Sequence, residues 1–368
     1  MNTRVISVVA AFLLLCFSGC AGNTLLKQPH DINAGLIKAD SMIEALQKKF
    51  SVPGVAFVLI RDNKIIHLKN FGLADVRTNS PVTDSTMFEA CSMSKPVFSY
   101  IAMKQIESGN LDLDKPVWTV YDDPAFKGQE LRKKITPRML LSHSSGLPNW
   151  RPGDDEENGY LPIEFTPGLK FSYSGEGMYY LQKVVEKITG TTLDEYARHT
   201  LFDQLSARHS SFVYKEEFGD NIAAGHNESG DYLKKTNYMR ANAGYSLYCS
   251  AHDFALFLIE MMSKDRTGKY SLSARTIDTM LSRQVPALTR KPLERPGTIN
   301  GIETFRGLGW AIDSTLSGDI YYHGGANSSG FRCYSQFNPR DGSGIVIMTN
   351  GLNGSDLWEA LIKEIGWL

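Results

Sequence analysis

The sequence predicts an α+β fold, in which an antiparallel β-sheet packs against a long, mostly helical insertion. Strand patterns occur near both ends of the chain, helical patterns fill the middle, and the two never alternate as βαβ units. The early and late strands can therefore pair in one sheet, with the middle packed against it as an insertion. We expect the sheet to come from about 38–90 and 300–368, and the helical insertion from about 91–299.

The first elements of the predicted sheet domain follow one another closely. A helix is expected over 38–50, where apolar residues recur at helical spacing. A continuous apolar run at 55–60 predicts a buried strand, and polar residues at 61–64 predict a turn to its hairpin partner at 65–71. These elements begin a domain that we expect to cover 38–368.

Helices in the middle are predicted from apolar periodicity together with start and stop signals. Pro137 stands at an early helical position, Gly190 is a stop signal and Ser250 is a suitable N-cap. The expected helices cover 93–108, a segment opening at 136, 177–188, 192–202 and 250–262. The later expected elements are strands at 308–313, 320–323, 331–337 and 345–350, then a closing helix at 359–365.

The composition is that of an ordinary globular protein. The 368 residues include 42% hydrophobic and 21% charged residues, which excludes a mainly disordered or coiled-coil chain. The 39 basic and 40 acidic residues give a net charge of −1. Because nucleic-acid binding needs a basic surface, no nucleic-acid partner is expected.

The N-terminus reads as a targeting segment. Arg4 precedes an apolar run over 5–17 that is shorter than the roughly 20 residues of a membrane span. The small residues before Cys20 resemble a bacterial lipoprotein signal. We therefore expect a signal peptide at 1–19, lipid modification of Cys20 and a tether at 20–37. An ordinary secretory signal cut nearby is the alternative.

The lipoprotein interpretation also predicts a location and changes the cysteine count. It implies an exported chain held to a membrane by its lipid anchor, in the periplasm or at the outer membrane, since Ala21 replaces the Asp of inner-membrane retention. The remaining cysteines permit at most one disulfide, and buried free thiols are the default for Cys91, Cys249 and Cys333. No Cys/His spacing predicts a metal site.

Ser92 and Lys95 form the first candidate for chemistry. Three residues apart at a helix start, they project from one face. A Ser hydroxyl becomes nucleophilic when a base takes its proton, and a Lys can be that base. Free N–H groups at a helix N-terminus suit a developing oxyanion. The alternative is a surface helix with an incidental Lys.

Two further segments would complete a site of this kind. Tyr173 precedes a predicted helix, where its hydroxyl could relay a proton between the nucleophile and Lys95. His323, Gly324, Gly325 and Ala326 end a late strand, and glycines there allow a close backbone approach to a ligand. Taken singly, each is more often structural, but one mechanism would need all of them.

These motifs together resemble those of the serine β-lactamases and penicillin-binding DD-peptidases, and among them the class C-like serine hydrolases and esterases. Ser92-Met93-Ser94-Lys95 matches the S-x-x-K motif, and Tyr173 matches the Tyr of Y-x-N. The run 140–148 resembles a class C-like segment, which we interpret as scaffold, and His323-Gly324-Gly325 resembles the H-x-G form of the third motif.

The resemblance implies the β-lactamase/DD-peptidase fold, an α+β fold in which an antiparallel β-sheet flanked by helices is joined to an all-helical subdomain. It also implies a serine hydrolase that needs no cofactor. It would act through an acyl-enzyme on a small-molecule or peptide substrate, as an esterase, DD-peptidase or β-lactamase does. The implied site comprises the nucleophile Ser92, the proton-transfer residues Lys95 and Tyr173, the oxyanion-hole N–H groups of Ser92 and Ala326, and the substrate-binding residues His323 and Gly325.

Two departures from the family pattern keep an alternative open. Gly175 stands where the family often has Asn, so an amide contact to the substrate is lost. His323 replaces the usual Lys and carries a charge only when protonated. The alternative is a non-catalytic lipoprotein of the same fold that binds cell-wall peptides or penicillins. An α/β-hydrolase is disfavoured because there is no G-x-S-x-G.

Overall fold

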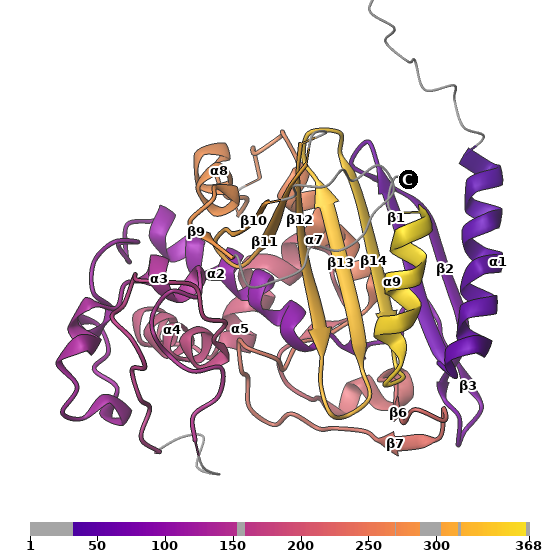
Figure 1. Cartoon of the computed structure of the whole chain (residues 1–368), viewed down its shortest axis with the longest axis horizontal. Helices are drawn as coiled ribbons and strands as arrows, with labels where there is room; N and C mark the ends of the chain where they lie inside the picture. Colours follow the sequence, from indigo (N-terminus) through magenta and orange to yellow (C-terminus); the bar gives the residue numbers. More distant parts are fainter. Residues whose placement is uncertain (1–31, 153–158, 269, 288–302, 316–317, 366–368) are drawn as a thin grey trace, which may run out of the picture.

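A computed structural model describes residues 32–152, 159–268, 270–287, 303–315 and 318–365. The predicted signal peptide and Cys20 lie outside the described residues, as does most of the predicted tether. Figure 1 shows a tall central sheet with a largely helical region on one side and two helices on the other.

The main sheet is antiparallel and has nine strands in the order β3-β2-β1-β14-β13-β12-β11-β10-β9. The early hairpin joins the late strands through β1 and β14, where Val55 lies opposite Thr349. This confirms the predicted pairing of the two ends of the chain. The strands are β1 Gly54–Arg61, β2 Lys64–Asp75, β3 Ser80–Pro81, β9 Val285–Pro286, β10 Glu303–Arg306, β11 Ala311–Thr315, β12 Gly318–Ala326, β13 Arg332–Asn338 and β14 Ser343–Thr349.

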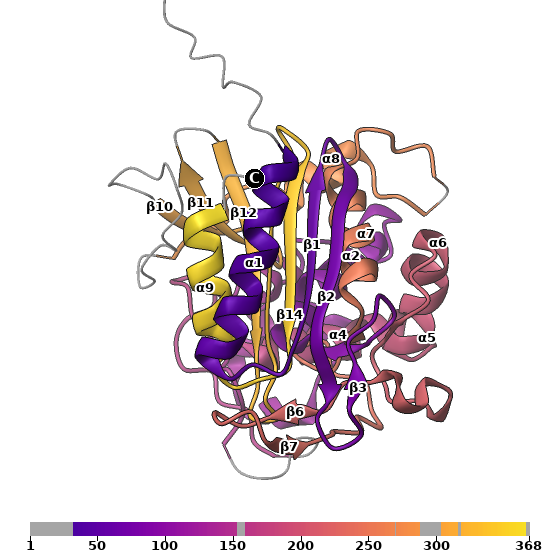
Figure 2. The same ribbon diagram turned by 90° about the vertical axis from the view of Figure 1, so that its right-hand side faces the viewer.

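The sheet is buried on both faces, which explains the unbroken apolar run in β1. Val55, Phe57 and Leu59 pack under α1 (Ile32–Phe50) and α9 (Gly354–Ile365). The alternate residues of β1 face the larger core that contains the middle helices. Figure 2 shows α1 and α9 on one face, and α2 (Ser94–Glu107) and α7 (Ala251–Met262) on the other.

The middle of the chain supplies the remaining α-helices; most lie close to predicted ranges, whereas the helices Asp203–Leu205 and Ala274–Leu281 were not predicted. Ser250 caps α7 by accepting a hydrogen bond from the Asp253 N–H at 3.1 Å, and Gly190 ends α4 in a left-handed conformation (φ 69°), as predicted. These helices are α2 Ser94–Glu107, α3 Pro137–Leu141, α4 Gly175–Thr189, α5 Leu193–Ala197, α6 Asp203–Leu205, α7 Ala251–Met262 and α8 Ala274–Leu281.

Some elements differ from the prediction. Helix α1 begins at Ile32, so the last residues of the expected tether are helical. The middle segment is also less purely helical than predicted, because it contributes β9 to the main sheet and forms two small sheets of its own. Strands of two or three residues are too short to show an alternation of apolar and polar residues in the sequence. The small-sheet strands are β4 Phe88–Glu89, β5 Ser210–Ser211, β6 Gly225–His226, β7 Tyr232–Lys234 and β8 Tyr248–Cys249.

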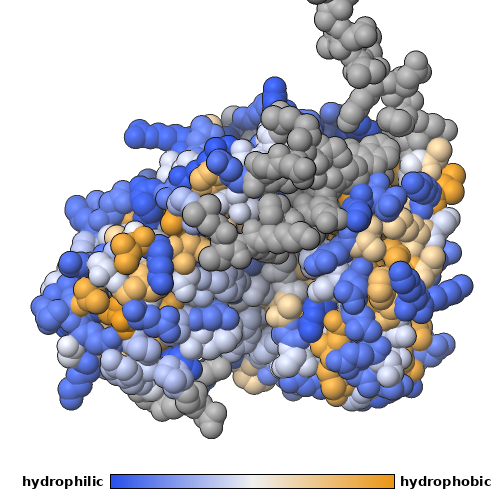
Figure 3. Space-filling model, viewed as in Figure 1, coloured by the Kyte–Doolittle hydropathy of each residue, from blue (hydrophilic) through white to orange (hydrophobic). Residues whose placement is uncertain are grey.

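In Figure 3, hydrophobic residues are scattered among hydrophilic ones on the face shown. Within the described ranges, no helix combines the length and apolarity needed to cross a membrane.

The thiols of Cys91, Cys249 and Cys333 are buried and free, and burial raises the pKa of Cys333 to about 12.

Candidate active site

Ser92 lies in a tight turn that leads into α2. Cys91, directly before it, has a left-handed backbone (φ 53°), which is uncommon for a residue other than Gly. Ser94 fastens the turn, because its buried hydroxyl donates to the Cys91 carbonyl at 2.6 Å and accepts from the Leu247 N–H at 3.0 Å. The turn therefore holds Ser92 half-buried at a fixed place.

Lys95 lies beneath Ser92 with its side chain fully buried. Its Nζ donates to the Ser92 Oγ at 3.1 Å and to the Gly244 carbonyl oxygen at 2.7 Å. Both acceptors are neutral oxygens, and the Gly244 contact directs the amine toward the hydroxyl. The structure thus brings together the two side chains that the spacing placed on one face.

Tyr173 adjoins this pair. The Lys95 Nζ is 4.7 Å from the centre of the Tyr173 ring. The next residue, Ser174, caps α4 by accepting from the Gly177 N–H at 2.8 Å, and its hydroxyl donates to the Pro148 carbonyl at 2.7 Å. These bonds fix the position of Tyr173 relative to Lys95.

His143 supports Tyr173 from the segment 140–148, which the sequence predicted as scaffold. The rings of His143 and Tyr173 have centres 4.5 Å apart, and His143 Nδ1 accepts from the Ser174 N–H at 3.2 Å. Burial, followed by the nearby charges of Arg306 and Lys95, holds the pKa of His143 well below its ordinary value. A neutral His143 is therefore a positioning group for Tyr173.

The end of β12 forms the opposite side of the site. His323 is buried, and its Nδ1 donates to the Gly324 carbonyl at 2.7 Å. Gly325 lies so close to the nucleophile turn that a Cβ there would stand 2.2 Å from the Ala90 carbonyl oxygen. Only glycine permits this approach, which carries the exposed Ala326 to the mouth of the site.

A cavity of about 470 Å³ joins these elements. Five predicted residues line it, and Lys95 lies behind Ser92 without lining it. The predicted residues on the wall are Ser92, Tyr173, His323, Gly325 and Ala326. The other lining residues are Phe171, Arg306, Gly324, Ser355, Trp358 and Glu359.

Arg306 is a wall residue that the sequence reasoning missed. It comes from β10, is buried, and places its guanidinium carbon 4.8 Å from the centre of the Phe171 ring and 5.9 Å from that of Tyr173. A guanidinium stays charged at any physiological pH. The cavity therefore contains a permanent cation although His323 replaces the expected Lys.

Comparison with known proteins identifies the family of the chain. The Beta-lactamase family model matches residues 39–364. The chain belongs to the Beta-lactamase family. It is 26% identical to penicillin-binding protein 4 of Amycolatopsis lactamdurans (88% of this chain, 87% of the relative) and 22% identical to a β-lactamase of Yersinia enterocolitica (95% and 93%).

Solved structures confirm the predicted fold class. The D-alanine carboxypeptidase AmpC of Burkholderia cenocepacia superposes with a TM-score of 0.72 at 20% identity, covering 92% of this chain and all of that one. The chain is thus a Beta-lactamase-family serine hydrolase with the α+β fold of β-lactamases and DD-peptidases.

The structure explains one departure from the family pattern. A Cβ on Gly175 would stand 2.4 Å from the indole of Trp150, so no larger residue fits there without movement. Trp150 is 44% exposed, and its ring centre lies 5.9 Å from the Lys95 Nζ. An aromatic surface therefore occupies the space beside Lys95 that an Asn side chain would need.

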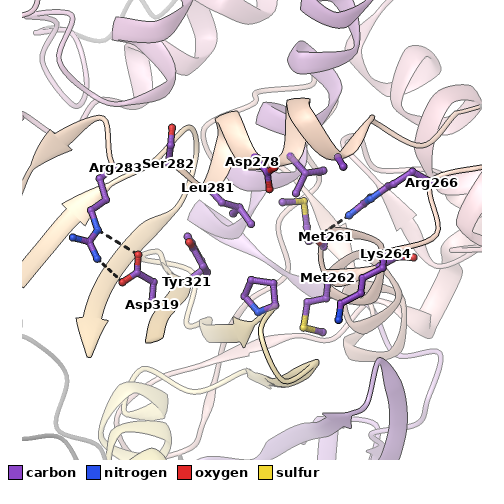
Figure 4. A pocket seen from close by; sticks show the side chains of 14 residues that line it. Met261, Met262, Lys264, Arg266, Asp278, Leu281, Ser282, Arg283, Asp319 and Tyr321 are labelled. Atoms are coloured by element: carbon purple, nitrogen blue, oxygen red, sulfur yellow. Dashed lines mark hydrogen bonds and ion pairs between the residues drawn. The ribbon is translucent and has the colours of Figure 1, made fainter. Parts of the chain in front are cut away.

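A larger pocket, of about 680 Å³, lies between the end of α7, α8 and β12. Figure 4 shows its wall, which includes the apolar Met261 and the aromatic Tyr321. On the same wall, Arg283 forms an ion pair with Asp319 at 2.7 Å. None of the predicted site residues lines it.

Proposed function

We propose that the protein hydrolyses an ester, amide or peptide through an acyl-enzyme on Ser92. The observation that carries this proposal is the 3.1 Å contact between the buried Lys95 amine and the Ser92 hydroxyl at the wall of a cavity. Family membership supports the reaction type, because penicillin-binding proteins and β-lactamases are among the relatives.

The proposed reaction has two acyl-transfer steps. The Ser92 Oγ attacks the substrate carbonyl carbon while its proton passes to Lys95, the base with which it shares a hydrogen bond. The bond to the leaving group then breaks, and Lys95 returns the proton to that group with help from Tyr173. In the second step water attacks the acyl carbon while Lys95 takes its proton. The bond to the Ser92 Oγ then breaks, and Lys95 returns the proton to that oxygen as the acid leaves. The backbone N–H groups of Ser92 and Ala326 would stabilise the oxyanion in both steps.

Arg306 supports a finer assignment of the substrate. Its permanent charge on the cavity wall favours a substrate with a carboxylate near the reacting carbonyl. D-Amino-acid peptides and penicillins carry such a group, whereas simple alkyl esters do not. His323 lines the same cavity and would border this subsite.

A matched substrate panel tests this assignment. Benzylpenicillin and its methyl ester, and an acylated D-Ala-D-Ala peptide and its amide, are compared with p-nitrophenyl butyrate by acyl-enzyme mass spectrometry and turnover. We expect the anionic member of each pair to react faster. Equal rates within both pairs would contradict the carboxylate assignment, and tight binding without a mass shift would favour the non-catalytic alternative.

We also propose that the chain is exported and anchored by a lipid on Cys20. The support is the charged, apolar and small-residue order of residues 1–20. Expression in a bacterium should yield a membrane-bound protein whose N-terminal peptide carries acyl chains, and Cys20→Ala should release it. An unmodified N-terminus, or fractionation unchanged by the substitution, would contradict this proposal.

A further inference from the structure

Glu89 is a buried carboxylate that the proposed mechanism does not use. It lies on β4, three residues before Ser92, and its side chain is fully inaccessible. One oxygen, Oε2, accepts three hydrogen bonds, all from neutral donors. The donors are the Tyr238 hydroxyl at 2.7 Å, the Asn327 Nδ2 at 2.6 Å and the Ser329 hydroxyl at 2.7 Å. Burying a carboxylate costs free energy unless it is hydrogen-bonded, so these three bonds offset the cost of burying Glu89.

Two of these donors belong to the turn that directly follows Ala326. Asn327 organises that turn, since its Oδ1 accepts from the Phe331 N–H at 3.2 Å and its carbonyl accepts from Arg332 at 2.5 Å. Glu89 therefore joins the segment that leads into Ser92 to the turn that follows Ala326, so it connects the chain next to each proposed oxyanion donor. Hydrogen bonds to a carboxylate are stronger than those between neutral groups.

The backbone of Glu89 also holds these segments close together. The Glu89 carbonyl accepts from the Cys91 thiol at 3.1 Å and from the Cys333 thiol of β13 at 3.6 Å. Gly325 and Ala90 are in the close backbone approach described above. The side-chain bonds of Glu89 act at the end of this contact, where β12 passes into the turn.

We propose that Glu89 is the positioning residue of the oxyanion hole, holding the turn after Ala326 so that the N–H groups of Ala326 and Ser92 converge on one oxygen. The inference rests on the proposed Ser92 acyl-enzyme and deepens it. Glu89 touches no reacting atom and acts through the backbone of Ala326. Its loss should weaken binding of the transition state while leaving binding of the ground state nearly unchanged.

The test measures kcat and KM on a reactive p-nitrophenyl ester, together with inhibition by a boronic acid, which forms a tetrahedral adduct on a serine. Removing a whole oxyanion donor costs about 10²–10³ in kcat, so its displacement in Glu89→Ala should cost about 10–100-fold, with KM within about threefold. Boronate affinity should fall in parallel. Glu89→Gln keeps one acceptor oxygen and should recover most of the lost rate.

Variants of the donors separate positioning from general stability. Ser329→Ala should lower kcat by less than Glu89→Ala does, and the double variant should lose no more than Glu89→Ala alone. Tyr238→Phe is the matched control. It removes a donor to the same Glu89 oxygen, but Tyr238 is not part of the turn after Ala326, so kcat should stay within about threefold of the wild type. If Glu89→Ala fails to fold, Ser329→Ala and Asn327→Ala carry the same test.

The outcomes distinguish this inference from the proposed function. If the wild type turns over and Glu89→Ala and Ser329→Ala match it in kcat and boronate affinity, the inference is overturned while the acyl-enzyme stands. A kcat loss in Tyr238→Phe equal to that in Ser329→Ala would assign Glu89 a general structural role and would also overturn it. If the wild type forms no acyl-enzyme or boronate adduct, both proposals fail.

Discussion

The two halves of the site are built in different ways. Ser92 and Lys95 share one turn, and their 3.1 Å contact follows from a spacing of three residues at the start of α2. Arg306 and His323 come from β10 and β12, and they approach only because Arg306 lies opposite Ala311 and Ala311 lies opposite Tyr322 in the sheet. The Ser92–Lys95 pair is local in sequence, whereas the side chains that face the substrate depend on strand register.

The largest effect on kcat is expected from removing the base of the local Ser92–Lys95 pair. Lys95→Met preserves volume but removes the base, so kcat should fall by about 10²–10⁴-fold on any substrate of the panel. Tyr173→Phe should have a smaller effect, because Tyr173 adjoins Lys95 and has no hydrogen bond to Ser92 among those in the described structure. Pre-steady-state acylation measures both. A Lys95→Met variant within threefold of the wild type would contradict the division of roles.

Removing the charge of Arg306, on the non-local side of the site, should change substrate selectivity more than the rate of the chemical step. Arg306→Gln removes the permanent charge, so kcat/KM should fall by about 10-fold for the anionic member of each substrate pair and little for the neutral one, since hydrogen bonds to charged groups contribute about 1.5–3 kcal/mol. Arg283→Gln, on the wall of the larger pocket, is the matched control. Equal losses on both members of a pair would contradict carboxylate recognition.

The smallest effect concerns the packing of His143 between the two halves. Its folded-state pKa is held well below the ordinary 6.5, so between these values the unfolded chain binds more protons. Stability should therefore be retained above about pH 6.5 and decline as the pH falls below it. His143→Gln should lessen this decline, and urea unfolding at pH 8 and pH 5 measures it. An equal decline in both proteins would contradict a neutral, buried His143.

The same contrast explains what the sequence could predict. Apolar periodicity and caps located β1, β2, α2, α4 and α7, and the pairing of early with late strands followed from their order. The S-x-x-K spacing is itself local, so it could mark Ser92 and Lys95 as a candidate pair, and the other motifs and the family resemblance strengthened that prediction. These features depend on residues close together in the chain or on hydrophobic burial.

Arg306 and Glu89 could not be found in that way. Arg306 stands on a four-residue strand without a clear period, and its place in the cavity depends on the pairing of β10 through β12. Glu89 acquires its role from bonds to Asn327 and Ser329, more than 200 residues away. The local sequence around Glu89 gives no signal for these particular contacts.

The two pockets give a related lesson about volume. The larger one, of about 680 Å³, is lined partly by an ion pair that satisfies its own charges. The smaller one, of about 470 Å³, gathers Ser92, Tyr173, Arg306 and His323 from separate elements. Converging reactive groups, rather than size, distinguish the candidate active site.

The most direct test of Ser92 as the nucleophile is intact-protein mass spectrometry after reaction with a fluorophosphonate, followed by peptide mapping. We expect one phosphonyl adduct per chain on Ser92 in the wild type, none in Ser92→Ala, and slower labelling in Lys95→Met. An adduct on another residue, or equal labelling of the wild type and Ser92→Ala, would contradict this assignment.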